Sequence, residues 1–298
     1  MADSAPYRQI GIVGTGRVAR AIGLALAPHS AAPARIWGRN PDHAADAVAI
    51  IGHGCAARNL ADIGRTCDLI VIAVSDDAMG RVIGDLATLD GPASPFAFHV
   101  SGGSGAALLA PLQDRGWLTA AIHPAMTFTG DPQAEVARMT GARFAVTGST
   151  QQASVAARAV VTRLGGVAVD VAEAHRPLYH AALCHGSNHL VTLIADACEA
   201  LAAAGVDDPA ALIAPLARAA LDNSLASGMA GLSGPLLRGD EGTIAGHVAA
   251  MRQDCPPLLA PYRAMARATL DALERADGTA RPDCLRAMLD QTPSSGIC

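Results

Sequence analysis

The stretch Gly11-Ile12-Val13-Gly14-Thr15-Gly16-Arg17-Val18-Ala19 lies near the start of the chain and decides the fold class. It continues a short apolar run that begins at Ile10, and it opens an apolar segment, Val18 to Ala27, with the periodicity of a helix. A buried strand, a glycine-rich turn and a helix in this order form the fingerprint of a dinucleotide-binding βαβ unit. A glycine-rich turn without any ligand is the alternative interpretation.

Each small residue of this stretch has its own role in the predicted site. Gly14 permits the tight turn after the strand, and Gly16 lets a pyrophosphate approach the backbone because no Cβ is in the way. Ala19 stands in the third position, where a small side chain lets the helix pack closely on the strand. The free N–H groups of the helix N-terminus attract phosphates. We therefore predict that the dinucleotide contacts Gly14, Thr15, Gly16, Arg17 and Val18.

The end of the second predicted strand, Ala34 to Trp37, indicates which dinucleotide binds. Sites for NAD usually place Asp or Glu there to bind the ribose 2′-OH, whereas sites for NADP lack that acid and have an arginine nearby. Here the strand is followed by Gly38-Arg39-Asn40-Pro41. The planar guanidinium of Arg39 suits a phosphate, and Asn40 can add a hydrogen bond and begin the next helix. We predict NADP as the cofactor; the alternative is that Arg39 is only a solvated loop residue.

Strands and helices alternate along the first part of the chain. Further strands are expected at Leu69 to Val74, Phe96 to Val100, Leu118 to Ile122, Phe144 to Val146 and Val167 to Val171. This alternation predicts an α/β Rossmann domain with a doubly wound, mostly parallel sheet over residues 1–171. Ligands of such sheets bind beyond the carboxyl ends of the strands. Those ends carry Val74, Ser75, Ser101 and His123, of which the first three are predicted to contact the cofactor.

From about residue 172 the sequence changes to segments rich in alanine and leucine, with helical periodicity. Helices are expected at Ala174 to Gly205, Pro209 to Ser227, Thr243 to Gln253 and Pro257 to Ala276. Residues 172–298 are therefore predicted to form an all-α domain. Only the final QTPSSGIC is expected to be disordered.

Composition excludes several classes of protein. Hydrophobic residues make up 51% of the chain, the formal net charge is −5, and no run rich in Lys or Arg occurs. We therefore expect neither a nucleic-acid partner nor a membrane partner. The N-terminus lacks the charged and apolar regions of a signal peptide. Seven scattered cysteines without a CxxC motif indicate a reduced, cytoplasmic protein.

The chain contains no lysine, because all 22 basic residues are arginine. No lysine can therefore act as a general acid, a Schiff-base former or a phosphate anchor. Arginine is a poor substitute in acid–base chemistry, since it stays protonated. A proton donor must be His, Tyr, Cys, Asp, Glu or water.

The candidate catalytic residues lie near the junction of the two predicted domains. His123 follows a strand, and His180, Cys184 and Asn188 recur at four-residue spacing near one face of the long helix. A histidine can exchange protons near pH 7. We predict that His123, His180 and Asn188 are catalytic, with His123 or His180 as the proton donor and Tyr179 or water as the remaining choice. The alternative is that the histidines only pack the helix or cap the strand.

Two other groups of polar residues have competing interpretations. His185 and His189 form an HxxxH pair, but no third ligand is evident, so no metal is expected. Arg238 lies in the turn-rich run Ser233 to Asp240. It is predicted either to bind a substrate carboxylate or to fix this loop against a neighbouring element.

Five motifs follow one another along nearly the whole chain: GIVGTGRVA, HVSGG, AIHPAMTF, YHAALCHGSN and SGPLLRGDEGTIAGH. Together they resemble the NADP-type Rossmann oxidoreductases with a helical C-terminal domain of unknown function. The broader relatives implied are ketopantoate reductases, 3-hydroxyisobutyrate dehydrogenases, pyrroline-5-carboxylate reductases and deazaflavin-dependent NADP reductases. The resemblance implies a C-terminal domain like that of 6-phosphogluconate dehydrogenase and a dimer formed through the helices. Ketopantoate reductases and hydroxyisobutyrate dehydrogenases rely on a lysine that this chain lacks.

The residues and the resemblance together predict an NADP(H)-dependent oxidoreductase that transfers a hydride between the nicotinamide and a small carbonyl or imine substrate. An imine substrate fits the absence of lysine, because a protonated imine accepts hydride readily. A non-catalytic NADP-binding redox sensor and a deazaflavin-dependent NADP reductase are the alternatives. The apolar helices predict a homodimer, since they carry more apolar surface than one small domain covers.

Overall fold

The computed structural model describes residues 6–89, 95–278 and 282–290. The chain divides into two compact units, Met1–His185 and Gly186–Cys298, which we call the N-terminal unit and the C-terminal unit. The division falls inside the long helix α8 (Arg176–Ala203), whose first turns belong to the N-terminal unit. The domain boundary after residue 171 stays a prediction, and the disorder expected for QTPSSGIC lies outside the described residues.

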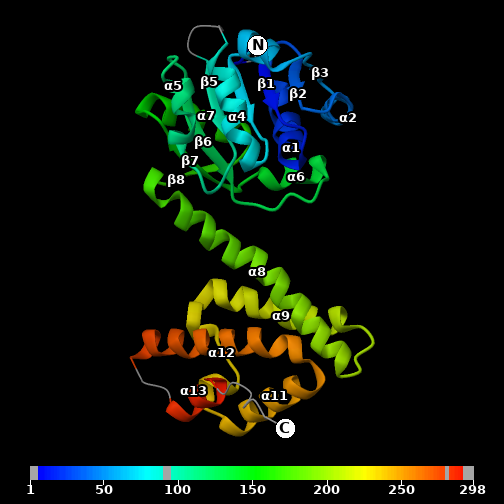
Figure 1. Cartoon of the computed structure of the whole chain (residues 1–298), viewed down its shortest axis with the longest axis vertical. Coiled ribbons are helices and arrows are strands. Elements are labelled where there is room, and N and C mark those ends of the chain that lie inside the picture. Colours follow the sequence, from blue (N-terminus) through cyan, green and yellow to red (C-terminus); the bar gives the residue numbers. More distant parts are fainter. Residues whose placement is uncertain (1–5, 90–94, 279–281, 291–298) are drawn as a thin grey trace, which may run out of the picture. The chain divides into compact units, whose positions relative to one another are not determined.

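An eight-stranded sheet in the order β3-β2-β1-β4-β5-β6-β7-β8 forms the N-terminal unit (Figure 1). The strands are β1 (Ile10–Val13), β2 (Ala34–Trp37), β3 (Gly54–Ala56), β4 (Leu69–Ile72), β5 (Phe96–His99), β6 (Leu118–Pro124), β7 (Arg143–Gly148) and β8 (Val167–Asp170). All neighbours are parallel except β6 and β7, which are antiparallel. The order of β1 to β6 is that of a Rossmann fold, whose strand order reverses direction between β1 and β4. The predicted fold class is confirmed.

Helices cover both faces of this sheet, because the central strands β1 and β4 are apolar or glycine at every position. In β4, Leu69 and Val71 join a core with α1 (Arg17–Leu26), α2 (Pro41–Ile51) and α7 (Gln151–Arg163). The alternate residues Ile70 and Ile72 join a second core with α3 (Leu60–Thr66), α4 (Asp76–Ala87) and α5 (Ala110–Gln113). Helix α6 (Pro132–Met139) lies beside α1. Successive side chains of a strand point to opposite faces, so one apolar run supplies both cores.

The C-terminal unit contains the rest of α8 together with α9 (Pro209–Ser227), α10 (Pro235–Arg238), α11 (Glu241–Asp254), α12 (Pro256–Asp277) and α13 (Asp283–Asp290) (Figure 1). Its buried core comes from α11, α12 and α13 and consists of Ile244, Val248, Ala266, Leu270, Leu285 and Leu289. Helix α9 has no buried residue. Across the described ranges, every helix is too short or too polar to cross a lipid bilayer.

Candidate functional site

The turn after β1 can be made only with glycine at position 14. Gly14 has a φ of 130°, and a Cβ there would lie 2.1 Å from the carbonyl oxygen of Ala73. A hydrogen bond from Ala73 N to Val13 O at 2.8 Å joins these two chain segments, and a bond from Gly14 N to Trp37 O at 2.8 Å ties the turn to the end of β2. The tight turn predicted for Gly14 is therefore imposed by the neighbouring strand β4.

Gly16 occupies a different environment, which is open. It is the N-cap of α1, no side chain caps the helix there, and a Cβ at Gly16 would have no other atom within 4 Å. The first turn of a helix has backbone N–H groups without partners inside the helix, which suits an anion at this end of α1. A cavity of about 190 Å³ lies here, and its walls include Gly14, Thr15, Gly16, Arg39, Val74 and Ser75 from the predicted set, and also Trp37, Gly38, Ala73, Ala78 and Val82.

The other predicted cofactor residues are not on the wall of this cavity. Arg17 is exposed, and its Nη1 donates to Phe128 O at 3.3 Å. Val18 packs against the core, and Asn40 caps α2 by accepting from Asp42 N at 2.8 Å. Ser101 is buried beyond β5, and its Oγ has no hydrogen-bond partner among the described residues. Their roles toward a cofactor stay predictions.

Arg39 stands exposed at the cavity edge, directly after β2 and Gly38. Across from it, the N-terminus of α4 carries Ser75 and Asp77. The pKa of Asp77 lies below its ordinary value, chiefly because the Ser75 hydroxyl and nearby backbone N–H groups donate to its carboxylate, with a smaller effect from the Arg39 charge. Strand β2 itself ends without a carboxylate, so an anionic group beside Arg39 would meet no acid from that strand.

A second group of polar residues is organised by the buried His99 of β5. Its Nδ1 accepts from Ser101 N at 3.2 Å, and its Nε2 lies 2.9 Å from Gly105 O. Because Nδ1 accepts, Nε2 must carry the hydrogen and donate it. Burial lowers the pKa of His99 and keeps the ring neutral. The ring therefore fixes both ends of the loop from Ser101 to Gly105.

This loop lies against two of the predicted catalytic residues. A Cβ on Gly102 would lie 2.5 Å from Cδ2 of His180 and 2.9 Å from Nε2 of His123. The two rings lie edge to face, with centroids 5.9 Å apart and an interplanar angle of 80°. The structure thus brings His123, near the carboxyl end of β6, together with His180 against the loop after β5, and only glycine at position 102 leaves room for both.

Two residues at the start of α8 complete this group. Tyr179 Oη lies 2.9 Å from His123 Nδ1. Arg176 is fully buried; its Nε donates to Thr147 Oγ1 at 2.8 Å, and its Nη2 donates to Ala121 O and Ala145 O at 3.0 and 3.1 Å. Sequence reasoning named Tyr179 only as an alternative and missed Arg176. Arg176 precedes Tyr179 by three residues and His180 by four on one helix, and this spacing was the available signal.

Burial controls the protonation of this cluster. The pKa of His123 falls from 6.5 to about 4, first because the ring is buried and then because the charges of His180 and Arg176 disfavour a second cation. Burial raises the pKa of Tyr179, and the Arg176 charge opposes that rise. At neutral pH the pair is therefore a neutral imidazole hydrogen-bonded to a neutral phenol.

The remaining predicted residues lie in the C-terminal unit. Asn188 accepts at Oδ1 from Ser187 Oγ at 3.0 Å. Arg238 is exposed at the end of α10, and Asp240 caps α11 by accepting from Thr243 N at 3.1 Å. The proposed roles of Asn188 and Arg238 stay predictions. Within the described parts of the chain, no three His, Cys, Asp or Glu side chains are grouped to hold a metal ion.

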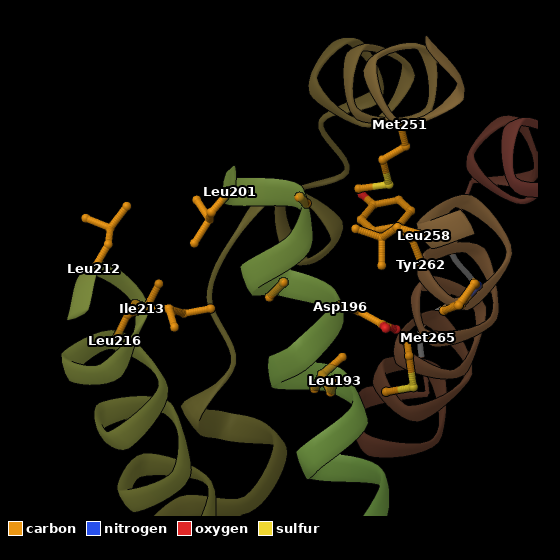
Figure 2. A pocket seen from close by; sticks show the side chains of 13 residues that line it. Leu193, Asp196, Leu201, Leu212, Ile213, Leu216, Met251, Leu258, Tyr262 and Met265 are labelled. Carbon is orange, nitrogen blue, oxygen red and sulfur yellow. The ribbon is translucent and has the colours of Figure 1, made fainter. Parts of the chain in front are cut away.

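The C-terminal unit has a cavity of its own, of about 540 Å³ (Figure 2). Its walls come from α8, α9, α11 and α12, and the labelled side chains in Figure 2 are mostly Leu, Ile and Met. Asp196 and Tyr262 supply the charged and hydroxyl groups among the lining residues. Such a wall can bury apolar groups but offers little to hold a phosphate.

Comparison with known domains identifies the two parts of the chain. A family model described as a Rossmann-like domain matches residues 3–124, and one described as a domain of unknown function, DUF2520, matches residues 142–269. The chain joins a Rossmann-like domain to a DUF2520 domain. The resemblance predicted from the sequence motifs is thereby confirmed. The DUF2520 match begins at β7, so Arg176, Tyr179 and His180 all belong to the DUF2520 domain.

Solved structures share this fold. A protein from Bacteroides fragilis provisionally assigned as an NADP oxidoreductase aligns with a TM-score of 0.72 and 18% identity, over 88% of this chain and 97% of its own. A reductive aminase from Aspergillus terreus, solved with NADPH and ethyl levulinate, aligns with a TM-score of 0.64 and 16% identity, over 95% of this chain and 98% of its own. A pyrroline-5-carboxylate reductase from Coxiella burnetii aligns with a TM-score of 0.56 and 14% identity, over 96% of this chain and 99% of its own. No curated protein matches the sequence.

Proposed function

We propose that this protein is an NADP(H)-dependent oxidoreductase that transfers a hydride between the nicotinamide and a small carbonyl or imine substrate. The observation that carries the proposal is the open space at Gly16, at the N-terminus of α1 and on the same cavity wall as Arg39. Gly14 is in close contact with neighbouring backbone, whereas Gly16 lines the cavity at a helix N-terminus and borders space that a pyrophosphate can fill.

The residues around this cavity fit an NADP dinucleotide. The N–H groups after Gly14 would hold the pyrophosphate, and Arg39 would bind the 2′-phosphate. Trp37 and Val82, on the same wall, offer apolar surface to a base. When bound, the dinucleotide supplies or accepts the hydride. The chain's own contribution is then to orient the substrate and to move a proton, which the cluster around His123 can do.

The similar structures support this substrate class. The similar structure from Aspergillus terreus is a reductive aminase bound to NADPH, and the one from Coxiella burnetii is a pyrroline-5-carboxylate reductase. Both names describe enzymes that act at a carbon–nitrogen bond, and such chemistry needs no lysine in this chain. Deazaflavin-dependent reduction of NADP and non-catalytic redox sensing are the competing functions. The scattered cysteines, free where they are described, support a location in the cytoplasm.

Two measurements test the proposal. Calorimetric titration should show binding of NADPH, and Gly16→Val should abolish it while the protein keeps a cooperative melt. Absorbance should then show NADPH consumption with cyclohexanone and allyl amine, the pair bound by the fungal relative. Binding without turnover of any carbonyl or imine would favour the sensor. Normal NADPH affinity of the Gly16→Val variant would show that the cavity at Gly16 is not the cofactor site.

We also propose that the protein is a homodimer formed through its C-terminal unit. Val191 of α8 is 72% exposed, and Leu216 and Leu225 of α9 are 71% and 79% exposed. Figure 2 shows Leu216 and Ile213 of α9 and Leu193 of α8 at the cavity wall. Apolar surface of this extent usually marks a protein–protein contact. A second copy of the chain is the partner we expect.

Light scattering at micromolar concentration should give twice the chain mass of 30.2 kDa. Leu216→Glu should reduce the mass to that of one chain, because the carboxylate cannot be buried unpaired. The control is Val155→Glu on α7, since Val155 is 59% exposed in the N-terminal unit. A wild-type mass equal to one chain, or an equal fall in mass for Leu216→Glu and Val155→Glu, would contradict the proposed dimer.

A further inference from the structure

The cluster of Arg176, Tyr179 and His123 contains a phenol that lies between a cation and a neutral base. The Arg176 Cζ lies 5.9 Å from the centroid of the Tyr179 ring, and the phenol oxygen lies 2.9 Å from His123 Nδ1. The two rings are nearly perpendicular, at 86°. All three residues belong to the N-terminal unit, so this geometry is set within one compact body.

His123 is poorly suited to be the proton donor itself. With a pKa of about 4 it carries no extra proton at neutral pH, and a neutral imidazole N–H is a very weak acid. It is suited to hold the phenol. If Nδ1–H donates to the Tyr179 oxygen, the phenol hydrogen is free to point away from the ring, and Nε2 is left as an acceptor.

Arg176 is placed to act on the phenol through its charge. Its hydrogen bonds go to neutral oxygens of Thr147, Ala121 and Ala145, and its Nη1 has no partner among the described residues. The cation is therefore only partly compensated by its own contacts. A negative charge developing on Tyr179 would be stabilised by it, since electrostatic interactions are strong at buried sites.

We propose that Tyr179 donates the proton that completes substrate reduction, that His123 restores this proton, and that Arg176 is the positioning residue that stabilises the phenolate. The inference deepens the proposed oxidoreductase function and rests on it. As the substrate carbon accepts a hydride from reduced nicotinamide, its oxygen or nitrogen takes the phenol proton and the O–H bond of Tyr179 breaks. His123 then passes its Nδ1 proton to the phenolate while Nε2 takes one from water, which leaves as hydroxide. Both side chains are then neutral, and loss of the Nε2 proton to solvent with uptake of one at Nδ1 restores the starting tautomer of His123 before the next turnover.

The first test follows turnover. Tyr179→Phe should lower NADPH consumption with cyclohexanone by about 10²- to 10⁴-fold, the usual effect of losing a general acid, and leave NADPH affinity unchanged. The matched control is Tyr7→Phe, because Tyr7 also carries an arginine over its ring, with Arg163 Cζ 5.5 Å from the centroid. Undiminished turnover of Tyr179→Phe with normal NADPH affinity would overturn the inference. Failure of the wild type to bind NADPH would instead overturn the proposed function.

The second test needs no substrate. The chain has three tyrosines, so Tyr7→Phe combined with Tyr262→Phe leaves Tyr179 as the sole phenol whose ionisation changes the ultraviolet spectrum. In this background, Arg176→Met should move the alkaline titration midpoint to higher pH, and Arg176→Lys, which keeps the charge, should move it less. An unchanged midpoint in a folded Arg176→Met variant would exclude Arg176 from the role. If that variant does not fold, Arg176→Gln, which also removes the charge, takes its place, and an unchanged midpoint in that folded variant would exclude Arg176.

Discussion

Both units of this chain are rich in apolar residues, but they place them differently. In the N-terminal unit every residue of β1, β4 and β5 is buried, and both faces of the sheet are covered. In the C-terminal unit α9 buries no residue, and in α8 the buried residue is Arg176, which belongs to the N-terminal unit. The central strands of the sheet are thus fully packed within one chain, whereas α8 and α9 leave apolar side chains exposed.

The same contrast applies to ligand binding. The cavity of the N-terminal unit combines free N–H groups, Arg39 and an open glycine, which recognise charge and shape. The cavity of the C-terminal unit is lined mainly by aliphatic side chains. The first can select a small anionic ligand, and the second can mainly exclude water. Substitutions can test whether the apolar packing of the N-terminal unit is complete within one chain and that of the C-terminal unit is not.

The largest effect is expected from Gly14→Val. The new side chain would meet Ala73 O at 2.1 Å and would need a φ of 130°, so unfolding of the N-terminal unit should become easier by more than about 4 kcal/mol. Urea denaturation followed by circular dichroism measures this. Gly16→Val is the matched control, because its Cβ meets no neighbour. Equal stability of the two variants would show that the β1 turn is not packed as described.

A smaller effect is expected from Leu270→Ala in the core of the C-terminal unit. Leu270 is fully buried, so its truncation should lower stability by about 3 kcal/mol. The control Leu216→Ala removes a side chain that is 71% exposed, and at nanomolar protein, where chains are expected to be separate, it should change little. At higher concentration Leu216→Ala should lower the melting temperature relative to wild type. If the melting temperatures of the wild type and of Leu216→Ala do not depend on protein concentration, the apolar surface of the C-terminal unit is not covered by a second copy.

The acid sensitivity of the N-terminal unit should depend on His123. In the unfolded chain this histidine gains a proton below pH 6.5, but in the folded protein it gains one only near pH 4. Its contribution to stability is therefore complete above pH 6.5, falls as the pH drops towards 4, and then levels off. His123→Asn should remove a loss of folding stability on the order of 2–3 kcal/mol between pH 6.5 and 4.

Chemical denaturation at several pH values between 4 and 7 measures this difference. His180, Arg176 and His99 favour the neutral form of His123, and Asp76 opposes them, so Asp76→Asn should strengthen the acid sensitivity. His99 also has a lowered pKa, and some sensitivity should remain in the His123 variant. Identical pH profiles for wild type and His123→Asn would show that the ring is not buried as described.

A similar or slightly smaller effect concerns Arg39 and the choice of dinucleotide. Loss of a charge-assisted contact to phosphate costs about 1.5–3 kcal/mol, so Arg39→Ala should weaken NADPH binding roughly 10- to 150-fold. Binding of NADH should be nearly unchanged. Arg252→Ala, an exposed arginine of α11, is the control and should leave both affinities unaltered. Equal losses for NADPH and NADH would sink the assignment of Arg39 to the 2′-phosphate.

The smallest effect is expected from Asn40→Ala. Asn40 accepts from Asp42 N at 2.8 Å as the N-cap of α2, and loss of such a cap lowers stability by about 1 kcal/mol. NADPH affinity tells whether the residue has a second role. A large loss of NADPH binding would show that Asn40 contacts the cofactor as well as capping the helix, and would support its place in the predicted site.

The sequence could predict those elements whose limits are set by local chemistry. The bounds of β2 and α9 agree with the prediction: Gly38 follows the strand, and the helix has Asp208 as its N-cap and Gly228 at its end. Other elements lacked such signals. Strand β3 is short and lies at the edge of the sheet, and α10 is a single turn within a run predicted as a loop. The antiparallel direction of β7 is not encoded in hydrophobic periodicity, which is the same for both directions.

The candidate site was predictable to the extent that sheet topology determines it. The rule that ligands lie beyond the strand ends indicated His123 and Ser101, and the structure places the loop from Ser101 against His123 and His180. Arg176 was not predictable in this way. A buried arginine is rare, and its partners Ala121 and Ala145 contribute backbone carbonyls, which any residue type could supply. The positioning role of His99 was missed for the same reason, since its partners are backbone atoms.

Trp37 gives the cavity proposed to bind the dinucleotide an intrinsic fluorescence signal. The chain has two tryptophans: Trp37 on the wall of the cavity, and Trp117 buried in the core beside α4 and α5. With Trp117 replaced by Phe, all indole emission would come from the cavity. A reduced nicotinamide dinucleotide absorbs where indole emits, so arrival of the cofactor should quench this fluorescence by energy transfer. The protein therefore carries an intrinsic reporter of occupancy, which makes the binding steps of every variant described above measurable in real time without a label.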